Sequence, residues 1–265
     1  MRYYDQHMHT YFSPDSIEHF ENYLEQSDKP LITTEHLDFF SPLQAIEDVI
    51  PDYSAYSAEV DRLNERYNNR LLKGIEVGFT YSDRDEIQAF LRGKAYDLVL
   101  LSIHHNGTHN FMILDDNAVP LAENLKEYYD LMLEGVKNFP NANVLAHFDY
   151  GLRSYEVTVE DLKLVEDRLK EIFKVVIQNG QAMELNTKSM YKYDNAHLYD
   201  YAIDLYQSVG GELFTIGSDA HHANDYEYHF EEAVKMLEEK GVKELVIFQK
   251  QKPIMVELPT KKVFV

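Results

Sequence analysis

The chain contains no cysteine and no tryptophan in 265 residues, and it has few basic residues for its size, 25 lysines and arginines. Without cysteine it forms neither a disulfide nor a thiolate metal site, and it has no cysteine nucleophile. No stretch approaches the roughly 18 apolar residues that a membrane span needs, and the first ten residues lack the apolar run of a signal peptide. We therefore expect a cytoplasmic protein with no membrane partner.

The scarcity of basic residues leaves a formal net charge of −21, because 46 residues are acidic. Such a field repels polyanions and offers no basic stripe to a nucleic-acid backbone, so we expect no nucleic-acid partner. What the chain does have is 12 histidines. With no cysteine available, bound metal ions would have to be held by imidazole and carboxylate groups.

Short β-rich runs alternate with amphipathic helical patterns along the chain. The predicted strands are Arg2–His7, Pro30–Glu35, Leu71–Val77, Asp97–His104, Asn143–His147, Gln181–Asn186, Glu212–Gly217 and Glu244–Phe248. The predicted helices are Tyr53–Asn69, Ala122–Asn138, Val159–Asn179, His197–Ser208 and Glu227–Lys240. This alternation predicts an α/β fold with a parallel sheet covered by helices, in a single domain over residues 1–265.

Histidines and carboxylates gather at or just beyond the carboxyl ends of these strands. They are His7, His9, Asp15, Glu35, His36, Glu76, His104, His105, His147, Asp219, His221 and His222. In α/β barrels the loops at the carboxyl ends build the active site, so these side chains should converge. His7 and His9 share one face if the strand continues through them, and Glu76 has two oxygens that can bridge two metals about 3.5–4 Å apart. Imidazole together with carboxylate favours zinc, manganese or iron(II).

Each of these residues also has a simpler interpretation. A histidine pair such as His7 and His9 is weak evidence by itself, a lone strand-end histidine such as His147 is more often structural, and Asp219 alone could cap a helix. The combination is harder to explain in this way. Eight of the 12 histidines fall at five predicted strand ends, and the acids Asp15, Glu76 and Asp219 share that edge. The joint pattern therefore favours a metal site.

At this point the sequence resembles a known family, the PHP (polymerase and histidinol phosphatase) superfamily, and within it the histidinol-phosphate phosphatase branch. The matching elements are the H-x-H of residues 7–9, Asp15, Glu35-His36, Glu76, Ser102–His105, Ala146–Asp149 and Gly217–His221. The resemblance implies a distorted seven-stranded (β/α) barrel, TIM-like and of the PHP type, that holds three divalent metal ions. One ion would take His7, His9, Glu76 and Asp219; a second would share Glu76 and add His104 and His147; the third would take Asp15, His36 and His221.

The resemblance also implies the activity and its machinery. We expect a metal-dependent phosphomonoesterase that hydrolyses L-histidinol phosphate in histidine biosynthesis, by attack of a hydroxide that bridges two of the zinc, manganese or iron(II) ions. Glu76, Asp15 and His221 are the predicted catalytic residues. Arg153 resembles the arginine that holds the substrate phosphate in relatives, although a solvated surface arginine is the alternative. The remaining predicted substrate contacts are His105 and His222, which are candidates for protonating the leaving group.

Several alternatives stay open at this stage. A PHP phosphatase could act on another small phosphate monoester, such as a nucleotide or phosphotyrosine, and a PHP module could bind metal without catalysis. An amidohydrolase-like barrel also begins with H-x-H, but it bridges its metals with a lysine at the end of strand four, where this chain has His104. Glu184 and Asn186 end the sixth predicted strand and could orient a ligand, touch substrate or satisfy the barrel interior. The oligomeric state is not predicted.

Overall fold

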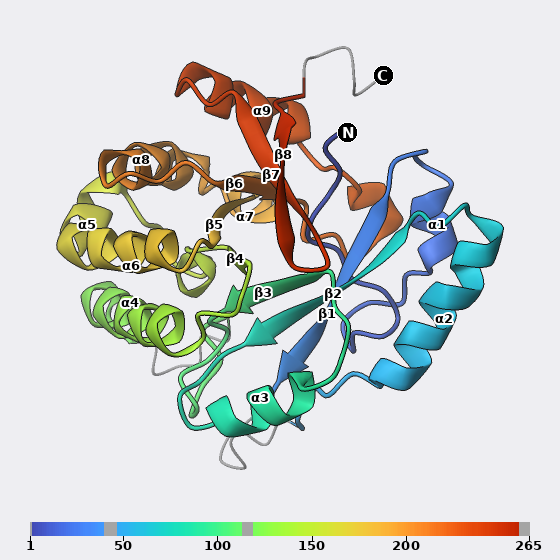
Figure 1. Ribbon diagram of the computed structural model, residues 1–265. Coiled ribbons are helices and arrows are strands. Elements are labelled where there is room, and N and C mark those ends of the chain that lie inside the picture. Colours follow the sequence, from blue (N-terminus) through green and yellow to red (C-terminus); the bar gives the residue numbers. More distant parts are fainter. Residues whose placement is uncertain (1, 40–46, 113–118, 260–265) are drawn as a thin grey trace.

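The computed structural model describes residues 2–39, 47–112 and 119–259. At its centre lies a parallel sheet of six strands in the order β1-β2-β3-β4-β5-β6, which curls into part of a barrel (Figure 1). The strands are β1 Leu31–Asp38, β2 Leu71–Gly78, β3 Leu98–Ser102, β4 Val144–Leu145, β5 Ala182–Asn186 and β6 Phe214–Gly217. Because neighbours in the sheet are also neighbours in sequence, all the carboxyl ends meet at one edge. The predicted α/β class and parallel sheet are confirmed.

Helices cover the outside of the curled sheet (Figure 1). They are α1 Phe20–Leu24, α2 Tyr53–Arg66, α3 Arg84–Leu91, α4 Leu121–Asn138, α5 Val159–Lys163, α6 Glu166–Gln178, α7 Thr187–Lys192, α8 Ala196–Ser208 and α9 Phe230–Glu239. In α6 the buried residues Leu169, Ile172, Phe173 and Val176 recur at three- and four-residue steps, which puts them on one face. In the part of the chain that the structure describes, no helix is long and apolar enough to cross a membrane.

The helix predicted over Val159–Asn179 is two helices in the structure. Thr158 begins α5 with a capping box, in which Thr158 and Asp161 satisfy each other's backbone N–H groups. The chain then turns at Leu164, whose side chain is 73% exposed. The apolar periodicity continues through this turn, which is why the sequence pattern did not reveal the break.

The strand predicted over Arg2–His7 is wrong, because no residue of this segment joins a regular ladder. Met8 makes an isolated parallel bridge to Ala220. The segment nevertheless lies between the two edges of the sheet: the N–H of Gln6 donates to the carbonyl of Ile216, and the N–H of Thr34 donates to the carbonyl of Met8. It therefore connects the β6 side of the sheet with β1.

Side chains replace the missing ladder hydrogen bonds in this segment. The carboxylate of Asp5 accepts from the backbone N–H groups of His7 and Ser218, at 3.1 and 3.0 Å. The hydroxyl of Tyr3 donates to the carbonyl of Ile216. Residues 3–10 are all buried, so the segment shows no alternation of exposed and buried side chains. A buried irregular strip of this kind reads as a strand from sequence alone.

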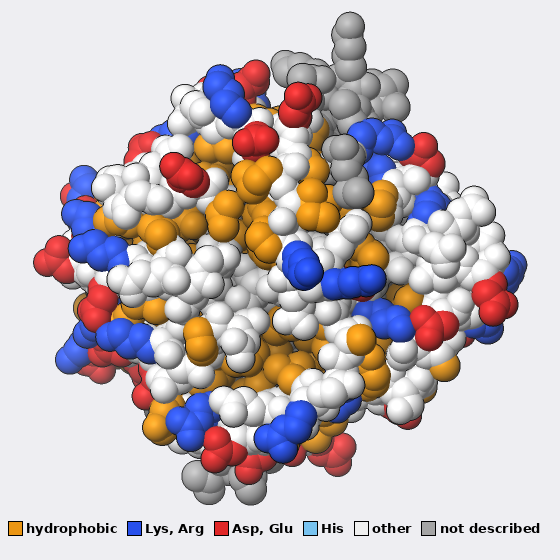
Figure 2. All heavy atoms as spheres, in the orientation of Figure 1, with side chains coloured by type: hydrophobic (Ala, Val, Ile, Leu, Met, Phe, Trp, Pro, Cys, Tyr) orange, Lys and Arg blue, Asp and Glu red, His pale blue; other side chains and the backbone are white. Residues whose placement is uncertain are grey.

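The last predicted strand, Glu244–Phe248, is confirmed as β7 (Glu244–Gln249), but it belongs to a separate two-stranded sheet. It pairs antiparallel with β8 (Lys252–Glu257), which the sequence pattern did not predict. Lys250 and Gln251 both have positive φ, as the two-residue turn of a tight hairpin requires. This hairpin crosses the end of the curled sheet in Figure 1. On the same face in Figure 2, hydrophobic side chains gather near the centre and charged ones lie mainly towards the rim.

Candidate metal centre

The nine predicted ligands converge on one cavity of about 320 Å³ at the carboxyl edge of the sheet. Seven of them line it: Asp15, His36, Glu76, His104, His147, Asp219 and His221. The other two, His7 and His9, are fully buried and stand within 3.5 Å of Glu76. The strand ends thus bring together residues from the beginning, middle and end of the chain.

Glu76 stands at the middle of the cluster and its two oxygens face different histidines. Oε1 lies 2.7 Å from Nε2 of His147 and 3.1 Å from Nε2 of His104. Oε2 lies 3.3 Å from Nε2 of His7, 3.5 Å from Nε2 of His9 and 3.0 Å from Nδ1 of His36. A carboxylate divided in this way has the geometry of a bridge between two metal ions.

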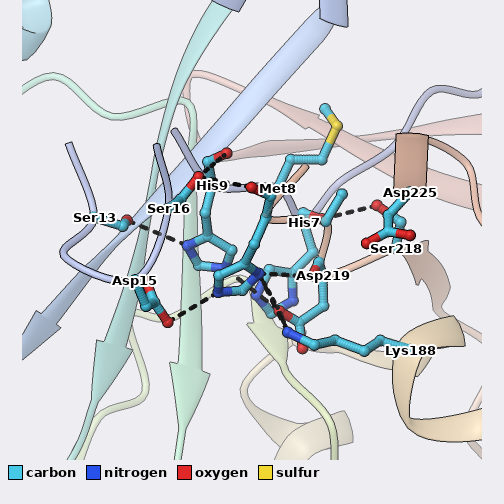
Figure 3. A network of polar contacts seen from close by, with 12 residues as sticks. His7, Met8, His9, Ser13, Asp15, Ser16, Lys188, Ser218, Asp219 and Asp225 are labelled. Atoms are coloured by element: carbon cyan, nitrogen blue, oxygen red, sulfur yellow. Dashed lines mark hydrogen bonds and ion pairs between the residues drawn. The ribbon is translucent and has the colours of Figure 1, made fainter. Parts of the chain in front are cut away.

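A further group lies at the outer side of the cluster (Figure 3). Oδ2 of Asp15 is 3.3 Å from Nε2 of His36 and 3.0 Å from Nε2 of His221. The Asp15 side chain is 53% exposed, whereas that of Glu76 is 1% exposed. This group is therefore the one nearest solvent, at the mouth of the cavity.

Asp219 follows β6 in a left-handed conformation, with φ of 53°. Its N–H donates to the carbonyl of His7, which ties it to the buried strip at the start of the chain. Oδ1 of Asp219 lies 3.6 Å from Nε2 of His9 and 3.5 Å from Nδ1 of His221. The left-handed turn aims the carboxylate back into the cluster.

The donor atoms of this centre fit metal ions. The buried atoms His7 Nε2, His9 Nε2, His36 Nδ1, His147 Nδ1 and Glu76 Oε2 have no hydrogen-bond partner. Leaving buried polar atoms unpaired is costly, so such a cluster calls for a further binding partner. Four groups of three side chains each offer ligand atoms within 4.8 Å of one another, among them His7, His9 and Glu76. Imidazole nitrogens and carboxylate oxygens are ligands that divalent transition metals accept.

The surroundings of Glu76 and Asp219 favour their ionised forms, which metal binding requires. Burial alone would raise the pKa of Glu76, but the neighbouring imidazoles of His7 and His104 hold it well below its usual value. Burial opposes ionisation of Asp219 in the same way, and the ammonium group of Lys188 is the main cause that holds its pKa down.

Arg153 is a buried residue of this cavity and not a solvated surface arginine. It follows the short 3-10 helix η2 (Tyr150–Leu152), and its Nε donates to Oγ of Ser189 at 2.7 Å. Its Nη2 donates to Oδ1 of Asn186 at 3.1 Å and to Oδ2 of Asp219 at 3.2 Å. These contacts fix the guanidinium group in the wall of the cavity.

Lys188 is a second cation in the cavity, to which the sequence analysis gave no role. Its Nζ lies 3.2 Å from Oδ1 of Asp219 and 3.2 Å from Nδ1 of His221. In Figure 3 its side chain reaches the histidine cluster from the side opposite Asp15. The available signal was its position, two residues beyond the end of β5 at Asn186, in the first turn of α7.

Two carboxylates contact predicted ligands from behind. Oδ1 of Asp38 lies 2.8 Å from Nδ1 of His104. Oε1 of Glu184 lies 2.7 Å from Nδ1 of His7, which is one of the roles that the sequence left open for Glu184. Asp38 was missed, although it stands two residues after His36 and so shares its face of a strand.

His105 and His222 do not line the cavity. His105 is buried, and its Nδ1 accepts a hydrogen bond from the N–H of Gly107. His222 is exposed and precedes the short helix η3, Ala223–Asp225. We therefore leave both residues out of the proposed site.

Known proteins resemble this chain over most of its length. The model of the PHP domain family matches residues 5–188. The histidinol-phosphatase of Lactococcus lactis is 28% identical over an alignment 264 residues long, which covers 95% of this chain and 96% of that protein. The probable histidinol-phosphatases of Clostridium acetobutylicum and Thermotoga maritima are 28% and 26% identical and cover 94% and 92% of this chain, with 97% and 94% of their own lengths matched.

A solved structure has the same fold. The crystal structure of histidinol phosphate phosphatase from Lactococcus lactis, complexed with zinc, L-histidinol and phosphate, matches with a TM-score of 0.84. The match has 24% sequence identity and covers 94% of this chain and 98% of that one. Because the family model spans well over half of the sequence, the chain belongs to the PHP domain family.

Proposed function

We propose that this protein is a metal-dependent phosphomonoesterase that hydrolyses L-histidinol phosphate to L-histidinol and phosphate. The observation that carries the proposal is the carboxylate of Glu76, held between two sets of histidines in a cavity that also presents Arg153. The substrate assignment is supported by the relatives, which bear the name histidinol-phosphatase over nearly the whole chain length.

We assign three divalent ions to the centre, of zinc, manganese or iron(II). Their proposed ligands are His7, His9, Glu76 and Asp219 for the first, Glu76, His104 and His147 for the second, and Asp15, His36 and His221 for the third. We also propose that the buried strip around Met8 acts as the seventh, irregular member of a PHP-type barrel, and that residues 1–265 form one domain. The strip's hydrogen bonds to Ile216 and Thr34 support this.

When bound, divalent ions would lower the pKa of a coordinated water to about 7, which makes it available as the nucleophile, and would stabilise charge on the phosphoryl oxygens. The protein's own groups bind and orient the ester. The guanidinium group of Arg153 is fixed by Ser189 and Asn186, so it can present its remaining N–H groups to phosphate oxygens with little loss of freedom. The ammonium group of Lys188 adds a second positive charge at the same wall.

These two cations also distinguish catalysis from simple metal storage. A storage site needs ligands, whereas fixed positive charges beside the ligands serve an anion that enters the cavity. Arg153 and Lys188 contact the two different oxygens of Asp219, so both stand at the edge of the proposed ligand set. This arrangement suits a phosphate ester placed against the metal ions.

The proposal is tested with a panel of phosphate monoesters that includes histidinol phosphate, nucleotides and phosphotyrosine, assayed with zinc, manganese or iron(II). We expect kcat/KM to be highest for histidinol phosphate by a wide margin. An Asp219→Asn protein purified in the same way controls for contaminating phosphatases. A higher kcat/KM for another ester would overturn the substrate assignment. If the metal-loaded protein hydrolysed none of the esters, the proposal that it is a phosphomonoesterase would be wrong.

A further inference from the structure

We propose that two carboxylates are positioning residues for proposed metal ligands: Asp38 holds His104, and Glu184 holds His7, on opposite sides of Glu76. Positions 78 and 217 have glycine because a side chain there would displace these carboxylates. The inference rests on the proposed metal centre. It adds two carboxylates and two glycines to the residues on which metal binding depends, none of which is a ligand.

The first pair stands behind the Oε1 side of Glu76. Oδ1 of Asp38 lies 2.8 Å from Nδ1 of His104, and Nε2 of the same ring lies 3.1 Å from Oε1 of Glu76. Asp38 is buried, with 3% of its surface exposed. A carboxylate on one ring nitrogen fixes the tautomer, because it accepts the Nδ1 proton and leaves the Nε2 lone pair for a metal.

Gly78 gives Asp38 its path to the imidazole. The two residues are direct partners in the β1–β2 register. A Cβ atom on Gly78 would lie 1.7 Å from Oδ1 of Asp38 and 2.9 Å from Nδ1 of His104. Any side chain here would displace the carboxylate from the ring. Gly78 is not among the residues with positive φ, so the glycine is needed for space and not for its backbone conformation.

The second pair stands behind the Oε2 side of Glu76. Oε1 of Glu184 lies 2.7 Å from Nδ1 of His7, and Nε2 of that ring faces Oε2 of Glu76 at 3.3 Å. The other oxygen of Glu184 accepts the backbone N–H of His147 at 2.7 Å. One carboxylate therefore orients the ring of one ligand and the main chain of another.

Gly217 has the same relation to Glu184 that Gly78 has to Asp38. A Cβ atom on Gly217 would lie 2.3 Å from Oε1 of Glu184 and 2.5 Å from Cβ of His7. The close approach of β6 to the buried strip at the start of the chain thus depends on a residue without a side chain. Both glycines end their strands, at the edge where the ligands converge.

Two other histidines have a carboxylate near Nδ1, but it belongs to a proposed ligand: Nδ1 of His36 lies 3.0 Å from Oε2 of Glu76, and Nδ1 of His221 lies 3.5 Å from Oδ1 of Asp219. The remaining hydrogen-bond partners on Nδ1 of His221, and those of His9, are neutral. Oγ of Ser13 lies 3.3 Å from Nδ1 of His9, and the backbone carbonyl of Asp219 lies 2.9 Å from Nδ1 of His221. These partners are neutral, whereas Asp38 and Glu184 are carboxylates, and hydrogen bonds to charged groups are the stronger class. Each side of Glu76 therefore has one imidazole backed by a carboxylate, and we expect that imidazole to determine how firmly its side holds metal.

The test measures zinc affinity directly. Asp38→Asn and Glu184→Gln proteins are loaded with zinc, and the dissociation constants and the zinc content per chain are determined by competition with a chelator. We expect about 10–100-fold weaker binding of at least one ion in each variant. The matched control is Asp97→Asn, which changes a part-buried carboxylate just before β3 that accepts the backbone N–H groups of Lys73 and Lys250 outside the cavity, and it should leave zinc affinity unchanged.

Variants of the glycines provide an independent test of the positioning roles. Gly78→Ala should weaken zinc binding as Asp38→Asn does, and the double variant should be no weaker than Gly78→Ala alone, because both changes remove the same contact. Gly74→Ala on the same strand places a Cβ 2.5 Å from the backbone oxygen of Thr33, so it should lower Tm and leave zinc affinity unchanged.

The outcomes separate the two proposals. Wild-type zinc affinity in both Asp38→Asn and Glu184→Gln, with only a lower Tm, would overturn the positioning roles. If the wild-type protein itself bound no divalent metal, the proposed function would fail first. Should Gly78→Ala not fold, the amide variants still decide the question.

Discussion

Nη2 of Arg153 lies 3.2 Å from Oδ2 of Asp219, so a guanidinium group in the cavity wall is tied directly to a proposed metal ligand. The pair therefore links a residue that we expect to bind metal, Asp219, with one that we expect to bind phosphate, Arg153. Because Asn186 and Ser189 also hold Arg153, its position does not depend on Asp219 alone. The first prediction follows from this.

Replacing Arg153 with alanine should chiefly raise KM for a phosphate monoester. Hydrogen bonds to charged groups contribute about 1.5–3 kcal/mol, and each 1.4 kcal/mol is a factor of about ten, so we expect a KM about 10–100-fold higher. Steady-state kinetics with the zinc-loaded enzyme measure the change. Arg153→Lys keeps the charge without the planar guanidinium group, so its KM should lie between those of the wild type and Arg153→Ala. An unchanged KM would remove Arg153 from the substrate site.

Replacing Lys188 with methionine should loosen metal binding at acidic pH. Its ammonium group is the main cause of the lowered pKa of Asp219, so without it the Asp219 carboxyl takes up a proton at a higher pH. We expect the pH at which half the zinc is released to rise. Lys192→Met is the control, because Lys192 pairs with Asp225 outside the cavity. Identical zinc-release curves for wild type and Lys188→Met would contradict the prediction.

Replacing Glu76 with glutamine should remove both activity and bound metal. The amide keeps the size of the side chain but loses the charge that faces His147 on one side and His36 on the other. Changes to groups that hydrogen-bond to metal ligands lower metal affinity or activity about 10–100-fold. Because Glu76 is itself a proposed ligand, we expect a larger loss of kcat/KM here. Glu86→Gln on the exposed face of α3 is the control. A Glu76→Gln protein with full activity and full metal content would refute the bridging role.

The stability of the metal-free protein should fall as the pH rises. Burial lowers the pKa of His104, but the carboxylates of Asp38 and Glu76 outweigh it and raise the pKa to about 9. The unfolded chain binds this proton with a pKa of about 6.5. The stabilisation is therefore complete below pH of about 6.5 and is lost as the pH rises through about 9.

Thermal unfolding of the chelator-treated protein across this range checks the prediction. The raised pKa values of His7 and His36 act in the same direction. Zinc competes with the same protons, so its apparent affinity should rise over the same range. Asp38→Asn should show a shallower decline in Tm. A Tm of the metal-free protein that stayed level or rose with pH would contradict the assignment.

The convergence of the ligands at the ends of the regular strands could be predicted because it follows from topology. Glu76, His104 and His147 occur at or near the ends of consecutive parallel strands, and parallel strands bring their ends to one edge. No tertiary detail is needed for that step. The same reasoning could not separate the residues that line the cavity from those that only lie near it, as His105 and His222 illustrate.

Asp38 was missed because of a strand boundary. The sequence pattern ended the second predicted strand at Glu35, whereas β1 continues to Asp38. Asp38 was therefore left outside the predicted strand, whereas it takes the ladder position opposite Gly78. Three more residues of strand would have placed Asp38 on the face of His36. Boundaries of this kind are set by pairing with β2, which a local pattern does not contain.

Side chains that substitute for the backbone explain the other differences. β4 was predicted as Asn143–His147 but contains only Val144 and Leu145 in regular pairing. Oδ1 of Asn143 accepts the N–H of Val99, and Glu184 accepts the N–H of His147, so side chains satisfy what a ladder would have satisfied. Such substitutions arise only when distant segments meet.

The buried strip around His7 also affects how the molecule assembles. His7 and Ser218, which share a hydrogen bond, are 211 residues apart in the chain. During synthesis the strip is therefore made long before its partners beyond β6. Contacts of such high order form late in folding. We therefore expect the seam that carries His7 and His9 to close late, so that the proposed ligands of the first ion come together only once β6 has been made.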